Sequence, residues 1–250
     1  DGGNDNIAGG DEIDIITGRG GNDNLTGGGG NDTFNVDSGT DTITDLSTGD
    51  ILVVSASATA NATNISSFVA TSSTSNAGTA NLSTQAGGGT INMSSAGGSA
   101  TYSLTGGNGV DNLTGDGGND NITGGDGADN LTGGGGNDTY IYSATSEAAS
   151  GETINDSSGT ADAISFAGSV DFSNMADSNF DNIEKLIFSG SNLTTTFKSS
   201  QLRGETIQLN ETSSGTSNLI INANAGSTID IANITATTFT SGQDTLTING

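Results

Sequence analysis

The 250-residue sequence contains no cysteine, histidine, proline or tryptophan. Without cysteine the chain has no disulfide framework, although this absence alone does not separate secreted from intracellular proteins. Without histidine and cysteine it also lacks the usual zinc ligands, the Ser-His-Asp triad and the cysteine nucleophile. We therefore expect that the chain is not an enzyme, and chemistry that uses carboxylates alone is the catalytic alternative left open.

Basic residues and long apolar runs are also scarce. Only 4 lysine and arginine residues stand against 29 acidic residues, which gives a formal net charge of -25 at pH 7. Such a charge disfavours nucleic acids and anionic membrane surfaces as partners. No apolar run reaches the ~18 residues that a membrane-spanning helix requires, so the sequence predicts no membrane insertion.

Glycine is abundant, with 41 residues, and much of it follows a period of nine. From Gly106 to Ile141 four consecutive nonapeptides read G-G-N-G-V-D-N-L-T, G-D-G-G-N-D-N-I-T, G-G-D-G-A-D-N-L-T and G-G-G-G-N-D-T-Y-I. Each unit has an aspartate at its sixth position and one large apolar residue two positions later. A glycine-rich loop followed by a polar-apolar-polar strand buries its apolar residue only by stacking on similar units. The sequence therefore predicts an all-β solenoid.

The aspartates of these units recur eighteen residues apart. If one coil of the solenoid is two nonapeptides, Asp111 faces Asp129 and Asp120 faces Asp138 on successive coils. Opposed carboxylates among loop carbonyls require a cation, and Ca²⁺ fits because it takes about 6 to 8 oxygen ligands in flexible geometry. Isolated Asx turns would explain single N-D-N motifs, but they require no nine-residue register over four units.

A first block of the same kind opens the chain. Its units keep the aspartate at the sixth position, although Glu12 and Arg19 replace glycines. The register continues through V-D-S-G-T-D-T-I-T and D-L-S-T-G-D-I-L-V, which lose the leading glycines but retain the aspartate. We predict six coil halves from Asp1 to about Val54, the last two forming an exit cap. The aspartates in register are Asp5, Asp14, Asp23, Asp32, Asp41 and Asp50.

Both blocks resemble the RTX (repeats-in-toxin) family, whose consensus G-G-x-G-x-D-x-U-x they match nearly letter for letter. The resemblance implies a parallel β-roll with several Ca²⁺ ions held between neighbouring coils by aspartates and loop carbonyls. It also implies an extracellular or cell-surface protein that leaves a Gram-negative cell unfolded by type I secretion. Carried over by position to the second block, it implies carboxylate ligands at Asp111, Asp120, Asp129 and Asp138, and carbonyl donors at Gly107, Gly109, Gly125 and Gly127.

Composition divides the chain into four segments. Residues 1–54 and 104–166 hold the two repeat blocks with their exit caps, because E-T-I-N-D from Glu152 repeats D-T-I-T-D from Asp41 and D-A-I-S-F from Asp162 repeats D-I-L-V-V from Asp50. Asp32 to Asp41 spans nine residues and Asp138 to Glu152 fourteen, so the second copy has a five-residue insertion, which we place at 143–150.

The other two segments lack the glycine-rich repeat. Residues 55–103 could form a disordered linker, but apolar residues spaced two or three apart in I-S-S-F-V, T-A-N-L-S, T-I-N-M-S and A-T-Y-S-L favour short strands. Residues 167–250 carry strand patterns such as T-T-T-F, N-L-I-I-N and T-I-D-I-A-N-I, which predict a continuing solenoid or a small sandwich that leads to a further repeat block.

These features favour a structural role. The segment F-D-N-I-E-K-L-I-F-S-G at 180–190 is similar to segments that follow such blocks in bacterial surface-layer proteins and large adhesins. We therefore expect a calcium-dependent structural protein that self-associates, or joins neighbouring repeats, through calcium. The alternative is a folding and secretion region of an exoenzyme whose catalytic domain is not in this chain. A cell-surface glycan or host receptor as partner, and sugar or ice binding at T-T-T-F, are further alternatives.

Overall fold

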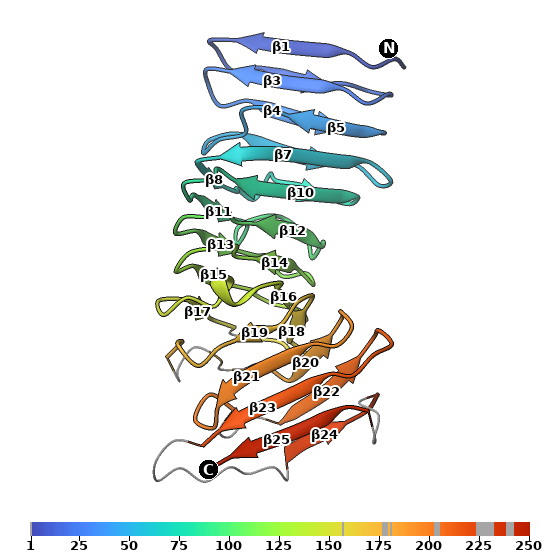
Figure 1. Cartoon of the computed structure of the whole chain (residues 1–250). Helices are drawn as coiled ribbons and strands as arrows, with labels where there is room; N and C mark the ends of the chain where they lie inside the picture. Colours follow the sequence, from blue (N-terminus) through green and yellow to red (C-terminus); the bar gives the residue numbers. More distant parts are fainter. Residues whose placement is uncertain are drawn as a thin grey trace.

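The computed structural model describes residues 2–156, 158–176, 180, 182–202, 206–223, 233–238 and 243–250. In this part of the chain the strands pair in parallel and stack as rungs from the N-terminus to the C-terminus (Figure 1). The chain is therefore an all-β parallel solenoid, as the nine-residue period predicts. Its described residues form no α-helix, and the short 3₁₀ turn η1 comprises Thr145–Glu147. None of their helices is long and apolar enough to cross a membrane.

One sheet runs the length of the solenoid, and three shorter sheets hold the remaining strands. The 12 strands of the long sheet are β1 (Asn6–Gly10), β3 (Asn24–Gly28), β5 (Thr40–Ile43), β7 (Thr59–Ile65), β10 (Thr79–Thr84), β12 (Tyr102–Thr105), β14 (Asn121–Thr123), β16 (Thr139–Tyr142), β18 (Ala163–Phe166), β20 (Lys185–Phe188), β22 (Ile207–Glu211) and β24 (Ile234–Ala236).

The three shorter sheets follow one another along the solenoid axis. The N-terminal short sheet contains β2 (Ile15–Thr17), β4 (Thr33–Val36), β6 (Ile51–Val54) and β9 (Ser75–Asn76). The central short sheet contains β8 (Ser67–Val69), β11 (Thr90–Asn92), β13 (Asn112–Thr114), β15 (Asn130–Thr132) and β17 (Thr153–Ile154). The C-terminal short sheet contains β19 (Val170–Asp171), β21 (Thr194–Lys198), β23 (Asn218–Asn222) and β25 (Thr245–Asn249).

The core is a set of apolar rows, one residue from each short strand. In the second block the apolar residue of every nonapeptide, Leu113, Ile122, Leu131 and Tyr140, is 0% exposed, while the polar residues on either side of it face outward or are half-buried. Stacking places Leu113 beside Leu131 and Ile122 beside Tyr140. A lean composition therefore suffices for an ordered core, because each coil buries the apolar side chains of its neighbours.

The coil length confirms the predicted register. Asn112 pairs with Asn130, and Asn6 pairs with Asn24, so residues eighteen apart lie side by side on successive coils. One coil is therefore two nonapeptides. The six predicted coil halves correspond to β1 to β6, which end at Val54.

Residues 55–103 continue the solenoid with longer coils and are not a disordered linker. Asn61 pairs with Asn81, and Asn81 pairs with Ser103, which corresponds to steps of 20 and 22 residues. The four predicted strands correspond to β8, β10, β11 and β12, and the structure adds β7 and β9. Buried Ala60 and Ala62 give β7 its inward face, which is why its sequence has little apolar signal.

Matching units of the two repeat blocks lie on opposite halves of the coil. The units G-G-G-G-N-D-T-F-N (27–35) and G-G-G-G-N-D-T-Y-I (133–141) match in sequence. Phe34 nevertheless lies in β4 of the N-terminal short sheet, whereas Tyr140 lies in β16 of the long sheet. The number of strands between the blocks therefore offsets the second copy by half a coil.

After the second block the coils become longer. The step from Asn130 to Thr153 is 23 residues rather than eighteen, which confirms the five-residue insertion, and η1 lies within it. Beyond it, residues 167–250 continue the solenoid around a cluster of phenylalanines, among them the stacked Phe172 and Phe197. The solenoid, not the sandwich, is the alternative observed. Of the strand predicted at 228–234, residues 228–232 lie outside the described residues, and β24 begins at Ile234.

Candidate metal centre

The repeat loops form two sets, one on each edge of the long sheet. Loops that leave the long sheet carry Asp14, Asp32, Asp50, Asp111 and Asp129, each just before a strand of a short sheet. On the other edge, Asp5, Asp23, Asp120 and Asp138 lie just before strands of the long sheet, and Asp41 is the second residue of β5. The ten aspartates predicted from the sequence are therefore divided between two edges and stack within each edge. Asp5 and Asp14 in the first coil are half-buried, and the other eight are buried.

One carboxylate oxygen of each stacked aspartate links two coils. The main-chain N–H of Asp111 donates to Oδ1 of Asp129 at 2.9 Å, and that of Asp120 donates to Oδ1 of Asp138 at 2.7 Å. The first block repeats the arrangement, with N–H to Oδ1 distances of 2.8 to 3.0 Å. Its donor and acceptor pairs are Asp5 and Asp23, Asp14 and Asp32, Asp23 and Asp41, and Asp32 and Asp50.

The second carboxylate oxygen separates the aspartates into two groups. In Asp14, Asp50, Asp111 and Asp120, Oδ2 accepts a main-chain N–H of its own loop at 2.7 to 2.9 Å. In a second group Oδ2 is buried and has no hydrogen-bond partner in the part of the chain that the structure describes. An unpartnered buried carboxylate oxygen costs free energy unless a proton or a cation binds to it. The predicted ligands in this second group are Asp23, Asp41, Asp129 and Asp138.

A glycine at the first position of the unit lies beside the carboxylate in both groups: a Cβ on Gly18 or Gly124 would lie within 3.0 Å of the unpartnered Oδ2 of Asp23 or Asp129. At the first position of the unit, a Cβ on Gly115 would lie within 3.0 Å of Oδ2 of Asp120 and of the carbonyl oxygen of Gly133. A Cβ on Gly106 would meet the carbonyl of Gly124 in the same way. A carboxylate oxygen and a main-chain carbonyl of the next coil thus line one small space. This oxygen-only donor set fits the ligand preference of Ca²⁺.

The four glycines predicted as carbonyl donors also stack from coil to coil. Gly125 and Gly127 have φ angles of +88° and +148°, which favour glycine, and a Cβ on them would lie within 3.0 Å of the carbonyl oxygens of Gly107 and Gly109. A Cβ on Gly127 would also lie 2.8 Å from Oδ1 of Asp129. The structure therefore brings the carbonyl of Gly109 to the aspartate side of the loop. The role of these four glycines as ligands stays a prediction.

Burial disfavours the ionised form of these carboxylates when no counter-ion is bound. It raises the pKa of Asp120 and Asp129 to about 6 and that of Asp138 to about 7, and hydrogen bonds from backbone N–H groups offset only part of this effect. Burial also raises the pKa of Asp41. When bound, Ca²⁺ would supply the positive charge that keeps these groups ionised and joins loops of neighbouring coils.

Three further acids continue the ladder and were not predicted as ligands. Oε2 of Glu152 accepts the N–H of Asp129 at 2.9 Å, and Oδ1 of Asp162 accepts that of Asp138 at 2.7 Å. Oε2 of Glu184 then accepts the N–H of Asp162 at 2.9 Å. The match between the two exit caps aligns Glu152 with Asp41 and Asp162 with Asp50. The sequence therefore contained a signal for both residues as ligands. Glu184 lies in a segment without repeat spacing, so no sequence signal points to it.

Two other acids occupy positions where the consensus has glycine. Asp116 stands at the second position of its unit, and Asp156 lies one coil beyond the first-position residue Gly133. Both are buried, and Oδ2 of Asp116 has no hydrogen-bond partner. Burial raises the pKa of both carboxyl groups.

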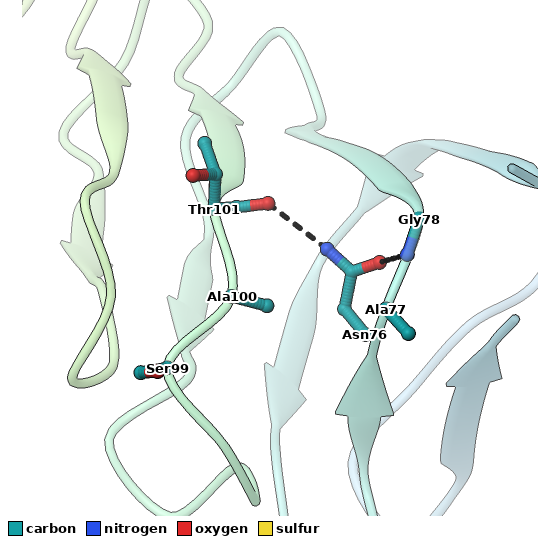
Figure 2. Close-up of a pocket in the computed structure, with 6 residues that line it drawn as sticks. All are labelled: Asn76, Ala77, Gly78, Ser99, Ala100 and Thr101. Carbon is teal, nitrogen blue, oxygen red and sulfur yellow. Dashed lines mark hydrogen bonds between the residues drawn. The ribbon is translucent and has the colours of Figure 1, made fainter. Parts of the chain in front are cut away.

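Between the two blocks the edge that enters the long sheet carries an amide instead of a carboxylate. Asn76 donates from Nδ2 to the carbonyl of Thr101 at 2.9 Å, and its Oδ1 accepts the N–H of Gly78 at 3.0 Å (Figure 2). Ala77, Ser99 and Ala100 complete the lining of this open pocket. Asn76 therefore links successive coils without charge, and the pocket has no carboxylate in its lining.

Comparison with known proteins agrees with this geometry. The family model described as RTX calcium-binding nonapeptide repeat (4 copies) matches residues 1–34, 8–43 and 105–140, the segments that contain the stacked glycine-rich loops. No curated protein and no solved structure gave a match. The two segments 1–43 and 105–140 therefore match the RTX calcium-binding nonapeptide repeat family.

Proposed function

We propose that the chain is part of a calcium-dependent extracellular structural protein of the surface-layer or repeat-adhesin kind. In this proposal the protein folds when it meets calcium after secretion and then assembles through calcium. RTX repeats are typical of secreted bacterial proteins, which supports an extracellular location. Export unfolded by type I secretion from a Gram-negative cell is part of the same proposal.

One observation carries the proposal: the long sheet passes without interruption through both repeat blocks and the segments between and after them. The carboxylates that would bind calcium are the groups that hydrogen-bond from coil to coil, as in Asp111 and Asp129. Calcium binding and coil stacking are therefore coupled along a rod. A rod whose order depends on calcium suits a load-carrying or spacing role outside the cell.

The energetics favour calcium as the switch. Sites in extracellular modules bind calcium with dissociation constants of about 10⁻⁴ to 10⁻³ M. At a tenfold excess over the dissociation constant each site would stabilise the folded chain by about 1.4 kcal/mol. Four such sites would together contribute roughly 6 kcal/mol, which is comparable to the whole stability of an ordinary domain, ~5 to 15 kcal/mol. Folding would then follow the step in calcium concentration between the cell interior and the medium.

Self-association is the proposed partner interaction. The chain has a formal net charge of -25, so copies repel one another unless cations screen or bridge their surfaces. Calcium in excess of the loop sites would reduce this repulsion. We propose no catalytic role for this chain.

The test is a calcium titration of the whole chain, followed by circular dichroism for the β-sheet signal and by light scattering and electron microscopy for assembly. We expect β structure first and ordered assemblies at higher calcium, both reversed by a chelator. A chain that folds with calcium but remains a monomer would contradict the structural assembly and favour the exoenzyme accessory region. A β-sheet signal that is unchanged by the chelator would overturn the calcium switch itself.

A further inference from the structure

Three buried carboxylates meet where the second repeat block ends. Asp138 precedes β16, Asp156 follows β17 and Asp162 precedes β18, so adjacent rungs of the solenoid bring them together. Their exposed fractions are 0%, 3% and 0%, and one carboxylate oxygen of each lies within 4.8 Å of the others. Asp156 and Asp162 lie outside the residues that the family model matches.

Two oxygens of this cluster are unpartnered. Oδ1 of Asp138 accepts the N–H of Asp120, and Oδ1 of Asp162 accepts the N–H of Asp138, but Oδ2 of both Asp138 and Asp162 has no hydrogen-bond partner. Asp156 differs, because its Oδ2 accepts the hydroxyl of Tyr140 at 2.9 Å. The cluster therefore holds two buried carboxylate oxygens that no donor among the described residues satisfies.

These oxygens border a space that two glycines leave open. A Cβ on Gly133 would lie within 3.0 Å of Oδ2 of Asp138 and 2.7 Å from Oδ2 of Asp156. A Cβ on Gly159 would lie within 3.0 Å of Oδ2 of Asp162 and of the carbonyl oxygen of Gly136. Two carboxylate oxygens therefore border the space beside Gly133, and a carboxylate oxygen and a main-chain carbonyl border the space beside Gly159.

The matching exit of the first block is built differently. Asp45 is the sequence counterpart of Asp156 in the D-T-I-T-D and E-T-I-N-D motifs. Its two oxygens accept the main-chain N–H groups of Gly27 and Gly28 at 2.9 and 2.8 Å. Protein donors therefore satisfy the carboxylate of Asp45, and it adds no free ligand to its loop. At the second exit the donors to Asp156 are the Tyr140 hydroxyl and the Ser158 N–H, and the unpartnered oxygens beside it belong to Asp138 and Asp162.

We propose that Asp138, Asp156 and Asp162 form a three-carboxylate site for a hard, oxygen-preferring cation such as Ca²⁺ or a lanthanide ion. The site differs from the repeat consensus because Asp156 adds a third carboxylate at a position where the preceding unit has Gly133. Affinity for such cations increases with the charge of the ligand set, so this site fills at lower ion concentration than the sites with fewer carboxylates. This site would bind its cation whether or not copies of the chain assemble.

Terbium luminescence provides a direct readout, because tyrosine excites a bound Tb³⁺ ion nearby. The chain has no tryptophan and 3 tyrosines, and Tyr140 contacts the cluster through Asp156. The whole chain, folded at saturating calcium and then exchanged into limiting Tb³⁺, should show sensitised emission from the first ion bound. Native mass spectrometry on the same samples counts the ions.

Two glycines of one loop give a matched pair of variants. Gly133→Ala places a methyl group among the cluster oxygens, whereas a Cβ on Gly135 meets only ordinary van der Waals neighbours at 3.5 Å and beyond. We expect Gly133→Ala to lose one tightly bound ion and to weaken the first binding step at least tenfold. Gly135→Ala should retain the ion with an affinity within threefold of the wild type. Equal ion counts and affinities in the two variants would overturn the site.

Charge removal supplies the second pair. Asp156→Asn should weaken binding of the first ion at least tenfold, whereas Asp45→Asn should leave it unchanged. Tyr140→Phe keeps the three carboxylates, so it should keep the ion while reducing the sensitised emission, even if Asp156→Asn does not fold. Retention of the ion in a folded Asp156→Asn would mean that Asp156 serves only to bind the Tyr140 hydroxyl. Loss of the ion in Tyr140→Phe would mean that the three carboxylates do not hold it by themselves. Either result would overturn the site.

Discussion

The main-chain N–H of Asp111 donates a hydrogen bond of 2.9 Å to Oδ1 of Asp129, eighteen residues later in the sequence and one coil away. Both side chains are 0% exposed. The other oxygen of Asp129 has no partner among the described residues, so one carboxylate joins two coils and also offers a free ligand atom. Coil stacking and cation binding therefore share a functional group, and a substitution can separate them.

Asp129→Asn separates these two roles. The amide oxygen of asparagine still accepts the N–H of Asp111, but the side chain no longer carries a charge for the cation. We expect the calcium concentration at half-folding to rise about tenfold, which corresponds to ~1.4 kcal/mol of lost binding free energy. Asp126→Asn is the control, because Asp126 is exposed in the same loop, and it should change the midpoint less than twofold. Equal midpoints for the two variants in a calcium titration by circular dichroism would refute the assignment.

Acidification should partly replace calcium. Burial raises the folded-state pKa of Asp120 to about 6, of Asp138 to about 7 and of Glu152 to about 8, above the unfolded values of ~4. The folded chain then binds more protons than the unfolded chain, so this contribution is fully present below pH ~4 and is lost as pH rises through 6 to 8. In calcium-free buffer the β-sheet signal should therefore be larger at pH 5 than at pH 8. A larger signal at pH 8 would contradict the burial of these groups.

Much of this architecture follows from the sequence because a period of nine has few physical solutions. The spacing of Asp111 and Asp129 predicts the eighteen-residue coil, since each unit has only one apolar residue to bury and must stack to bury it. The repeat does not show in which sheet each unit lies, because a polar-apolar-polar triplet fits the long sheet and a short sheet equally well. Phe34 and Tyr140 therefore lie in different sheets despite matching units.

The details of the ion sites are less predictable for a related reason. Asp45 and Asp156 match in sequence, yet one accepts two main-chain N–H groups of the preceding coil and the other the hydroxyl of Tyr140 and the N–H of Ser158. The difference follows the longer coil, since the step between stacked loops is eighteen residues at Asp45 and 23 at the second exit. Sequence spacing gives the order of residues along the chain, but hydrogen-bond partners depend on how each inserted turn folds.

The apolar rows should dominate the stability of the calcium-bound chain. Leu131 is 0% exposed and lies between Leu113 and Ile154 of the neighbouring coils. Leu131→Ala removes packing on both sides and should lower the free energy of unfolding by about 3 kcal/mol, as buried leucine truncations do. Asn130→Ala in the same strand removes an exposed amide ladder bond to Asn112 and should cost less than about 1 kcal/mol. Denaturant unfolding at saturating calcium measures both, and similar costs would contradict the core assignment.

A strained loop residue in the first block gives a prediction of opposite sign. Arg19 has a φ angle of +73°, where the equivalent residues Gly28 and Gly125 have +98° and +88°. A left-handed backbone costs a residue with a Cβ about 1 to 2 kcal/mol, although glycine returns part of this gain through the greater entropy of its unfolded state. Arg19→Gly should therefore stabilise the calcium-bound chain by about 0.5 to 1 kcal/mol. Arg19→Ala removes the same charge but keeps the Cβ, so it should be less stable than Arg19→Gly. Equal unfolding free energies for the two variants would show that Arg19 acts through its charge and not through its backbone.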